Sequence, residues 1–499
     1  MLQKLAKQSA IYGVSTIVGR LLGYLLTPYF TRIFEREAYG IITDVYALIP
    51  FALVLLSMGM ESSYFRFATK AELEGGNGGD GGDQSGVQRA KQELFATAWG
   101  ITSLAAAVFC GLIFLFISPV SVAMGEAYVA NPKYVEIVAL IVLFDVSMLI
   151  PFARLREMGE AKKYASIKIF NIFMQVALAV GFGCAGLYAT EFGVGWALVA
   201  NLVASVATFA VVLTTTGRTI PKINWVLLSA LFVYSMPLLL SGIAGTATDF
   251  IDRQMIKYIT PVGAMAQLGV YGAVTKIAVV MTLFTQMYRL AAEPFFLANI
   301  KKDDFKTMNA EAMKYYIIFS VMIFLGISLF RDIFVLIVGE SYREGIFILP
   351  VILGANVMMG VWLNLSFWYK REERTKFALY ITLTGLAASI VANLIMIPRW
   401  GYFGAAWARL IGETVMVAVS YWLNCKYFPT PYKLGRIGEY ILLGVMLYGA
   451  SEVAINYIDS RVLMFGVNTL LLGGYVLWAV WRENIDVVAM ARSATRRRG

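Results

Sequence analysis

The stretch Val135–Leu155, VEIVALIVLFDVSMLIPFARL, is long and apolar enough to cross a lipid bilayer as a single helix. A spanning helix needs about 20 predominantly apolar residues, because the hydrocarbon core of a bilayer is about 30 Å thick. Similar runs recur along the whole chain of 499 residues, of which 59% are hydrophobic and 15% charged. Soluble globular chains have about 25% charged residues. The sequence therefore predicts an all-α polytopic membrane protein.

Apolar runs of spanning length predict about fourteen transmembrane helices. Their expected ranges are 8–32, 39–66, 94–118, 135–155, 164–187, 193–214, 230–256, 267–290, 314–337, 346–369, 376–397, 403–424, 437–457 and 463–482. The first run continues to spanning length without a cleavage site, so we expect a membrane helix there and no signal peptide. Basic residues gather in alternate connectors, which predicts that both termini are cytoplasmic.

Composition also argues against several kinds of partner. The net charge of +10 comes from short basic clusters between apolar runs, so we expect no nucleic-acid partner. The chain has no histidine, and its three cysteines, Cys110, Cys184 and Cys425, have no metal-ligand spacing. We therefore expect no metal site and no cofactor.

A faint internal repeat bears on the domain organisation. Gly13–Arg20 aligns without gaps on Gly242–Asp249, an offset of 242 − 13 = 229 residues, and the same offset pairs Gly40 with Gly269. An even number of spans separates the copies, so the halves share one orientation and are related by a pseudo-twofold axis along the membrane normal. This predicts a six-helix N-lobe over 1–222, a six-helix C-lobe over 223–430, and two C-terminal helices with a basic tail over 431–499.

Several short segments resemble a known family. They are Tyr39–Thr43 (YGIIT), Met58–Phe67 (MGMESSYFRF), Tyr234–Pro237 (YSMP), Asp252–Arg253, and Gly269–Tyr271 ahead of Lys276. Through them the chain, from Ala10 to about residue 430, resembles the polysaccharide transporters of the multidrug/oligosaccharidyl-lipid/polysaccharide (MOP) exporter superfamily, which include the O-antigen flippases. The resemblance implies a multi-pass flippase of the bacterial cytoplasmic membrane, which exports an undecaprenyl-pyrophosphate-linked oligosaccharide by alternating access in polysaccharide or lipopolysaccharide biosynthesis.

Charged residues inside apolar runs are candidate sites, because a charge in hydrocarbon is costly unless it faces a cavity or a partner. The candidates for substrate binding are Arg20, Lys276, Arg289, Arg66 and Arg253. Arg20 either meets a pyrophosphate or pairs with Asp249, which is its equivalent in the repeat. Lys276 has no acidic residue three or four positions away. Arg66 and Arg289 lie at the inner ends of their spans and either recruit phosphate or extend to the lipid headgroups.

Three carboxylates within the spans, Asp145, Asp249 and Asp44, are the candidates for coupling transport to protons or sodium ions. The sequence does not distinguish the two ions. Asp145 has no basic residue within a helical turn, and Asp44 lies near the outer end of its span.

Other functions compete with flipping of a lipid-linked saccharide. An enzyme is not expected, because the outer connectors are too short to build a reaction site and no phosphate-binding GxxxxGK[ST] motif is present. A multidrug (MATE-like) antiporter and a peptidoglycan-precursor flippase of the same superfamily remain open, since fold does not determine function. We expect a monomer in contact with membrane lipids, and other glycan-assembly proteins remain open as partners.

Overall fold

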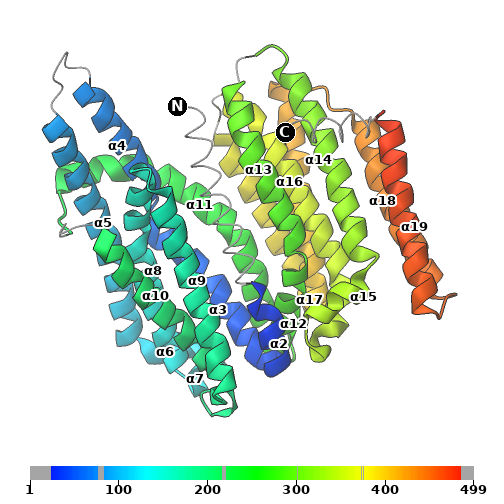
Figure 1. Ribbon diagram of the computed structural model, residues 1–499, viewed down its shortest axis with the longest axis horizontal. Helices are drawn as coiled ribbons and strands as arrows, with labels where there is room; N and C mark the ends of the chain where they lie inside the picture. The colour runs from blue at the N-terminus through cyan, green and yellow to red at the C-terminus, as the bar shows by residue number, and fades with distance from the viewer. Residues whose placement is uncertain are drawn as a thin grey trace, which may run out of the picture. The chain divides into compact units, whose positions relative to one another are not determined.

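The computed structural model describes residues 24–76, 84–215, 221–299, 302–372, 374 and 376–484. In this part of the chain the regular structure is helical throughout (Figure 1). Eleven of the described helices are long and apolar enough to cross a membrane, or twelve when one bent pair counts as a span. The predicted all-α polytopic membrane fold is confirmed. The number fourteen stays a prediction, because most of the first expected span, 8–32, lies outside the described residues.

Each expected span from the second onward lies within one helix or across consecutive helices. The helices up to residue 277 are α2 (Leu26–Ile33), α3 (Arg36–Ser57), α4 (Met60–Gly76), α5 (Gln84–Leu115), α6 (Ile117–Met124), α7 (Glu126–Ala130), α8 (Lys133–Glu157), α9 (Ala161–Cys184), α10 (Gly195–Thr215), α11 (Trp225–Ile259) and α12 (Ala264–Ile277). Those that follow are α13 (Val279–Ala298), α14 (Phe305–Ser328), α15 (Arg331–Phe334), α16 (Leu349–Arg371), α17 (Lys376–Tyr427), α18 (Leu434–Ile455) and α19 (Arg461–Arg482).

The second and the eighth expected spans are interrupted in the structure. The second span changes from α3 to α4 at Met58 and Gly59, which have φ values of 49° and 68°. The eighth is bent by 49° between α12 and α13. At that bend Asn356 Nδ2 donates a hydrogen bond to the carbonyl oxygen of Ala278, 3.4 Å away. Hydropathy misses both breaks because the apolar pattern continues across them.

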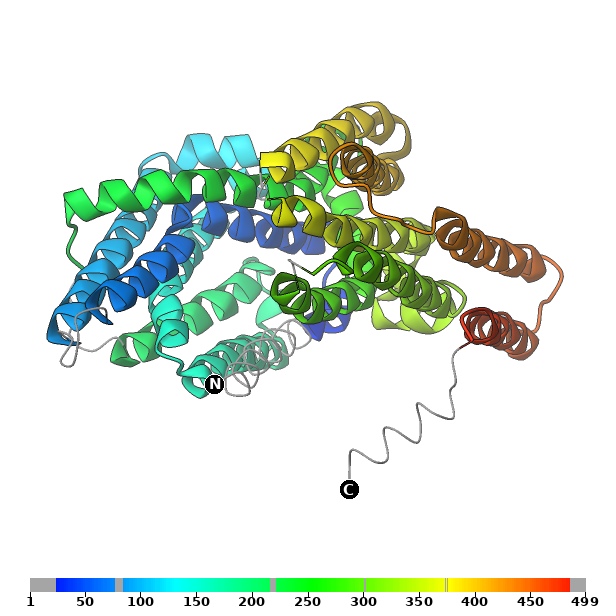
Figure 2. The same ribbon diagram turned by 90° about the horizontal axis from the view of Figure 1, so that it is seen from above.

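The chain forms two compact units, unit 1 over 1–273 and unit 2 over 274–499. Helix α11 belongs to unit 1, where it runs along α3 and α4 (Figure 2). The lobe boundary at residue 222 comes from the sequence repeat and stays a prediction about the transport lobes.

Close packing in unit 1 depends on small residues and stacked rings. Gly40 of α3 and Gly269 of α12, which the repeat pairs with one another, lie in contact: a Cβ on Gly269 would come within 3.1 Å of the Gly40 nitrogen. On the α11 side of α3, the rings of Phe51 and Phe250 stack with centroids 4.4 Å apart. Larger side chains at these two glycines would force the helices apart, so both glycines allow the close crossing of α3 and α12.

Unit 2 has an aromatic core and carries the last two helices. Rings of Phe296, Phe305, Phe367 and Trp368 are buried within this core. The buried Glu483, just after α19, accepts hydrogen bonds from Tyr440 at 2.8 Å and from Lys314 of α14. Burial raises the pKa of Glu483, but these bonds outweigh it and hold the pKa below its usual range. The carboxylate therefore ties α18 and α19 to the body of unit 2.

Candidate functional site

The break between α3 and α4 positions one predicted site residue, Arg66. A Cβ on Gly59 would lie 2.9 Å from the carbonyl oxygen of Ser235, so only glycine fits where α4 begins against α11. One turn later Ser63 Oγ donates to the carbonyl oxygen of Leu231 at 3.1 Å. Together the two contacts fix α4 along α11 and place Arg66 beside Tyr234 of α11.

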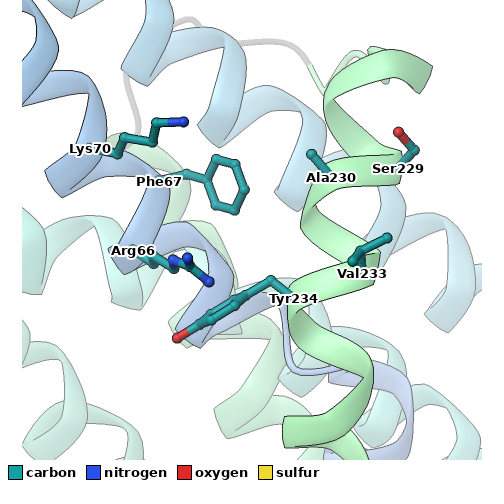
Figure 3. Close-up of a pocket in the computed structure, with 7 residues that line it drawn as sticks. All are labelled: Arg66, Phe67, Lys70, Ser229, Ala230, Val233 and Tyr234. Atoms are coloured by element: carbon teal, nitrogen blue, oxygen red, sulfur yellow. The ribbon is translucent and has the colours of Figure 1, made fainter.

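Arg66 lies in a basic and aromatic groove between α4 and α11. Its guanidinium carbon is 4.1 Å from the centre of the Tyr234 ring, and Lys70 follows one turn later on α4 (Figure 3). The groove encloses 490 Å³, and its lining consists of Arg66, Phe67, Lys70, Ser229, Ala230, Val233 and Tyr234. A neighbouring hollow of 720 Å³ shares Arg66, Lys70 and Tyr234. We call these two hollows together the Arg66 groove.

The Arg66 groove has the chemistry of a phosphate site. An arginine over an aromatic ring keeps its N–H groups in the guanidinium plane, where they are available to a bidentate acceptor. Among the described residues no carboxylate lies within ion-pair distance of Arg66. Lys70 pairs with Glu74 at 3.5 Å, but both side chains are more than half exposed, so the pair is weak and readily exchanged. Two cations at one turn's spacing are therefore available to an anionic headgroup.

Of the other predicted cations that the structure describes, Lys276, Arg289 and Arg253 are not among the residues that line the Arg66 groove. Arg20 lies outside the described residues. Lys276 is half-buried near the end of α12, two residues before the bend at Ala278. Arg289 is exposed and pairs with Glu293 at 3.7 Å. Arg253 Nη1 donates to the backbone carbonyl of Asp249 one turn earlier, at 3.0 Å.

Asp44, predicted as an ion-coupling residue, is the centre of a buried polar cluster in unit 1. Its carboxylate is 2.5 Å from Lys257 Nζ and also accepts hydrogen bonds from Gln254 Nε2 at 2.7 Å and Tyr128 Oη at 2.6 Å. The side chains of Asp44 and Lys257 are 1% and 5% exposed. Burial and the neighbouring Asp44 carboxylate raise the pKa of Tyr128, in the short helix α7, well above its usual range, so Tyr128 stays a donor. We call these four residues the Asp44 cluster.

The remaining candidate carboxylates have different surroundings. Asp145 is half-buried and accepts a hydrogen bond from Ser205 Oγ at 2.7 Å. Although no base lies within a turn of it on α8, Lys168 of α9 interacts with it electrostatically. The side chain of Asp249 is exposed. In the described part of the chain, no three metal-ligating side chains gather to hold a metal ion.

Sequence reasoning missed Lys70 and Tyr234 of the Arg66 groove, and Lys257, Gln254 and Tyr128 of the Asp44 cluster. Lys70 follows Arg66 at i+4, and Tyr234 belongs to the quoted YSMP segment, so the sequence contained a local signal for each of them. Lys257 had none that points to Asp44, because 213 residues separate the two.

Comparison with known proteins identifies the family of this chain. The family model described as polysaccharide biosynthesis protein matches residues 5–300, a range that contains the Arg66 groove and the Asp44 cluster. No curated protein sequence matches the chain.

Solved structures share the fold at low sequence identity. The lipid II flippase MurJ in an inward closed conformation has a TM-score of 0.73 and 12% identity, covering 95% of this chain and 100% of that one. An inward-facing MATE-family multidrug transporter of the MOP superfamily has a TM-score of 0.65 and 14% identity, covering 87% and 95%. The MATE multidrug transporter DinF-BH has a TM-score of 0.61 and 15% identity, covering 85% and 95%. The chain therefore belongs to the polysaccharide biosynthesis protein family and has the membrane-transporter fold of the MOP superfamily.

Proposed function

We propose that this protein flips an undecaprenyl-pyrophosphate-linked oligosaccharide across the bacterial cytoplasmic membrane, and that the Arg66 groove receives the pyrophosphate. The observation that carries the proposal is the pair of available cations, Arg66 and Lys70, with Arg66 stacked on Tyr234. A pyrophosphate has at least two negative charges, which cannot enter hydrocarbon without cations to meet them. Stacked arginine provides bidentate contacts and lysine a second point charge.

The location of the groove fits the cytoplasmic start of transport. The expected topology places the ends of α4 and α11 that form the groove toward the cytoplasm, the side from which an exporter takes up its substrate. Transport then proceeds by alternating access, with both termini in the cytoplasm. Asp145, Asp249 and Asp44 stay the candidates for coupling to protons or sodium ions, and Arg20, Lys276, Arg289 and Arg253 the candidates for later contacts with the substrate.

The family and the fold favour a transporter over an enzyme. Two transported substrates compete with a lipid-linked saccharide, because the similar structures include MATE multidrug transporters and a lipid II flippase. A cationic drug is disfavoured at the Arg66 groove, where two cations would repel it. A peptidoglycan precursor has the same pyrophosphate and must be separated by experiment.

Depleting the protein in its own host tests the proposal. We expect the lipid-linked oligosaccharide to accumulate and the surface polysaccharide to fall, because the carrier can no longer reach the outer leaflet. Mass spectrometry of extracted carrier lipids measures the accumulation. Accumulated peptidoglycan precursor with normal polysaccharide would identify a precursor flippase instead. Unchanged carrier lipids with greater sensitivity to cationic drugs would identify a drug exporter.

A further inference from the structure

A second cavity of unit 1 lies where α3 begins and α11 ends, whereas the Arg66 groove lies near the beginning of α11. It encloses 770 Å³, within the usual size range of ligand pockets. The side chains that matter here are Glu35, Glu37, Glu126, Tyr128, Lys257 and Tyr258. The expected topology places this cavity at the outer side of the membrane. We call it the outer cavity.

The aromatic wall of the outer cavity is held in place. The Tyr258 hydroxyl donates a hydrogen bond to the backbone carbonyl of Ala123 at 2.8 Å, while its side chain stays 58% exposed. An anchored and exposed ring loses little entropy when a ligand packs on it. The Tyr128 hydroxyl donates a hydrogen bond to the buried Asp44 carboxylate, which fixes the position of its ring. The outer cavity therefore offers a fixed aromatic surface beside polar groups.

The charges around the outer cavity disfavour an anion. Among the described residues that line the outer cavity, Lys257 is the one cation, and the Asp44 carboxylate at 2.5 Å already neutralises it. The exposed carboxylates of Glu35, Glu37 and Glu126 also line the outer cavity, so its described lining holds more carboxylates than cations. A phosphate that fits the Arg66 groove would be repelled here.

An organic cation is disfavoured for a different reason. Lys257 Nζ lies 4.7 Å from the centre of the Tyr128 ring and 5.1 Å from that of Tyr258. The protein's own ammonium thus already makes cation–π contacts with both rings, which weakens the attraction of either ring for a second cation. What remains is a set of carboxylate acceptors and an exposed ring face. These suit a ligand with many hydroxyl donors and apolar C–H faces, which is the chemistry of a sugar.

We propose that the outer cavity is a saccharide subsite, which binds the phosphate-free sugar portion of the transported molecule. The inference rests on the proposed function, and it adds a second site with the opposite charge preference. Unit 1 then holds a basic site for the pyrophosphate and an acidic, aromatic site for the glycan.

Ligand binding to the full-length protein in lipid nanodiscs tests the subsite. The probe is the oligosaccharide released by mild acid from the host's lipid-linked pool and freed of phosphate by phosphatase. Saturation-transfer NMR should detect its binding to the wild type. Tyr258→Ala should raise the dissociation constant about tenfold or more, because the stacking surface is lost. Tyr258→Phe keeps the ring and should change it less than Tyr258→Ala.

Matched controls separate the subsite from general effects. Glu126→Gln should weaken binding, whereas Glu191→Gln on another exposed segment and Tyr457→Ala on an exposed turn of unit 2 should not. Unchanged oligosaccharide binding in Tyr258→Ala and Glu126→Gln, or no binding to the wild type, would overturn the subsite. The subsite would also be overturned if the wild type bound tetraphenylphosphonium more tightly than the oligosaccharide and the same two variants abolished that binding.

Binding of inorganic pyrophosphate in the same samples monitors the proposed function independently. It should be lost in Arg66→Ala and retained in Tyr258→Ala. Intact pyrophosphate binding without saccharide binding would mean that the subsite inference fails alone. A wild-type protein that does not bind pyrophosphate would count against the Arg66 groove instead.

Discussion

Replacing both Arg66 and Lys70 by alanine is expected to reduce polysaccharide export to the level of cells that lack the protein. Each charge-assisted hydrogen bond to a phosphate contributes about 1.5–3 kcal/mol, so losing contacts from two cations should weaken substrate capture by a factor of 100 or more, on the order of 3–6 kcal/mol. Surface polysaccharide and accumulated carrier lipid measure export, and membrane abundance of the protein measures folding. Arg66→Lys should retain part of the activity, because ammonium keeps the charge and loses the bidentate geometry.

The control for this prediction is Arg374→Ala. Arg374 is exposed and lies 4.8 Å over the Tyr427 ring, so it makes the same kind of cation–π contact in unit 2. Its replacement should leave export near normal. Normal export by the Arg66→Ala, Lys70→Ala double variant at wild-type abundance would contradict the role of the Arg66 groove.

The second large effect concerns the Asp44 cluster. Asp44→Ala is expected to destabilise the protein by about 3–5 kcal/mol, because it leaves the buried Lys257 ammonium without its counter-charge. Tyr128 and Gln254 lose an acceptor in the same variant. Adding Lys257→Met should recover part of the loss, since the unpaired charge is then removed. Thermal unfolding of the purified protein in detergent measures these differences.

An exposed ion pair provides the comparison for the Asp44 cluster. Glu74→Ala removes the partner of Lys70 where both side chains are more than half exposed, and should cost less than about 1 kcal/mol. Equal unfolding temperatures for Asp44→Ala and the wild type would contradict a structural role for the cluster. An Asp44→Ala, Lys257→Met double variant that is less stable than both single variants would contradict the pairing of Asp44 with Lys257.

Local sequence patterns predicted the helices well because hydropathy depends on each run alone. The apolar runs located the spans of α8 and α16, and Arg66 stood out as a charge at the end of an apolar run. The Arg66–Tyr234 contact could not be predicted, since it joins two helices far apart in sequence through the approach of Gly59 to Ser235. The YSMP segment marked Tyr234 only through family resemblance.

The Asp44 cluster illustrates the same limit more strongly. As a carboxylate within a span, Asp44 suggested an ion-coupling residue, and that role stays a prediction. Its pairing with Lys257 depends on α3 packing against α11, which no periodicity in either helix encodes. The contact of Gly40 with Gly269 is an intermediate case: the repeat paired these two positions, but only the structure shows that they touch.

Translocation in reconstituted vesicles tests the central claim most directly. Purified protein is incorporated into liposomes with a fluorescent undecaprenyl-pyrophosphate-linked oligosaccharide, and an external glycosidase cleaves whatever substrate reaches the outer leaflet. Proton, sodium and electrical gradients are applied in turn, so that any coupling is satisfied. We predict that wild-type vesicles expose the inner pool faster than protein-free vesicles, and that the Arg66→Ala, Lys70→Ala variant does not. Wild-type protein that never exceeds the protein-free rate under any of these gradients would contradict the proposed flippase function.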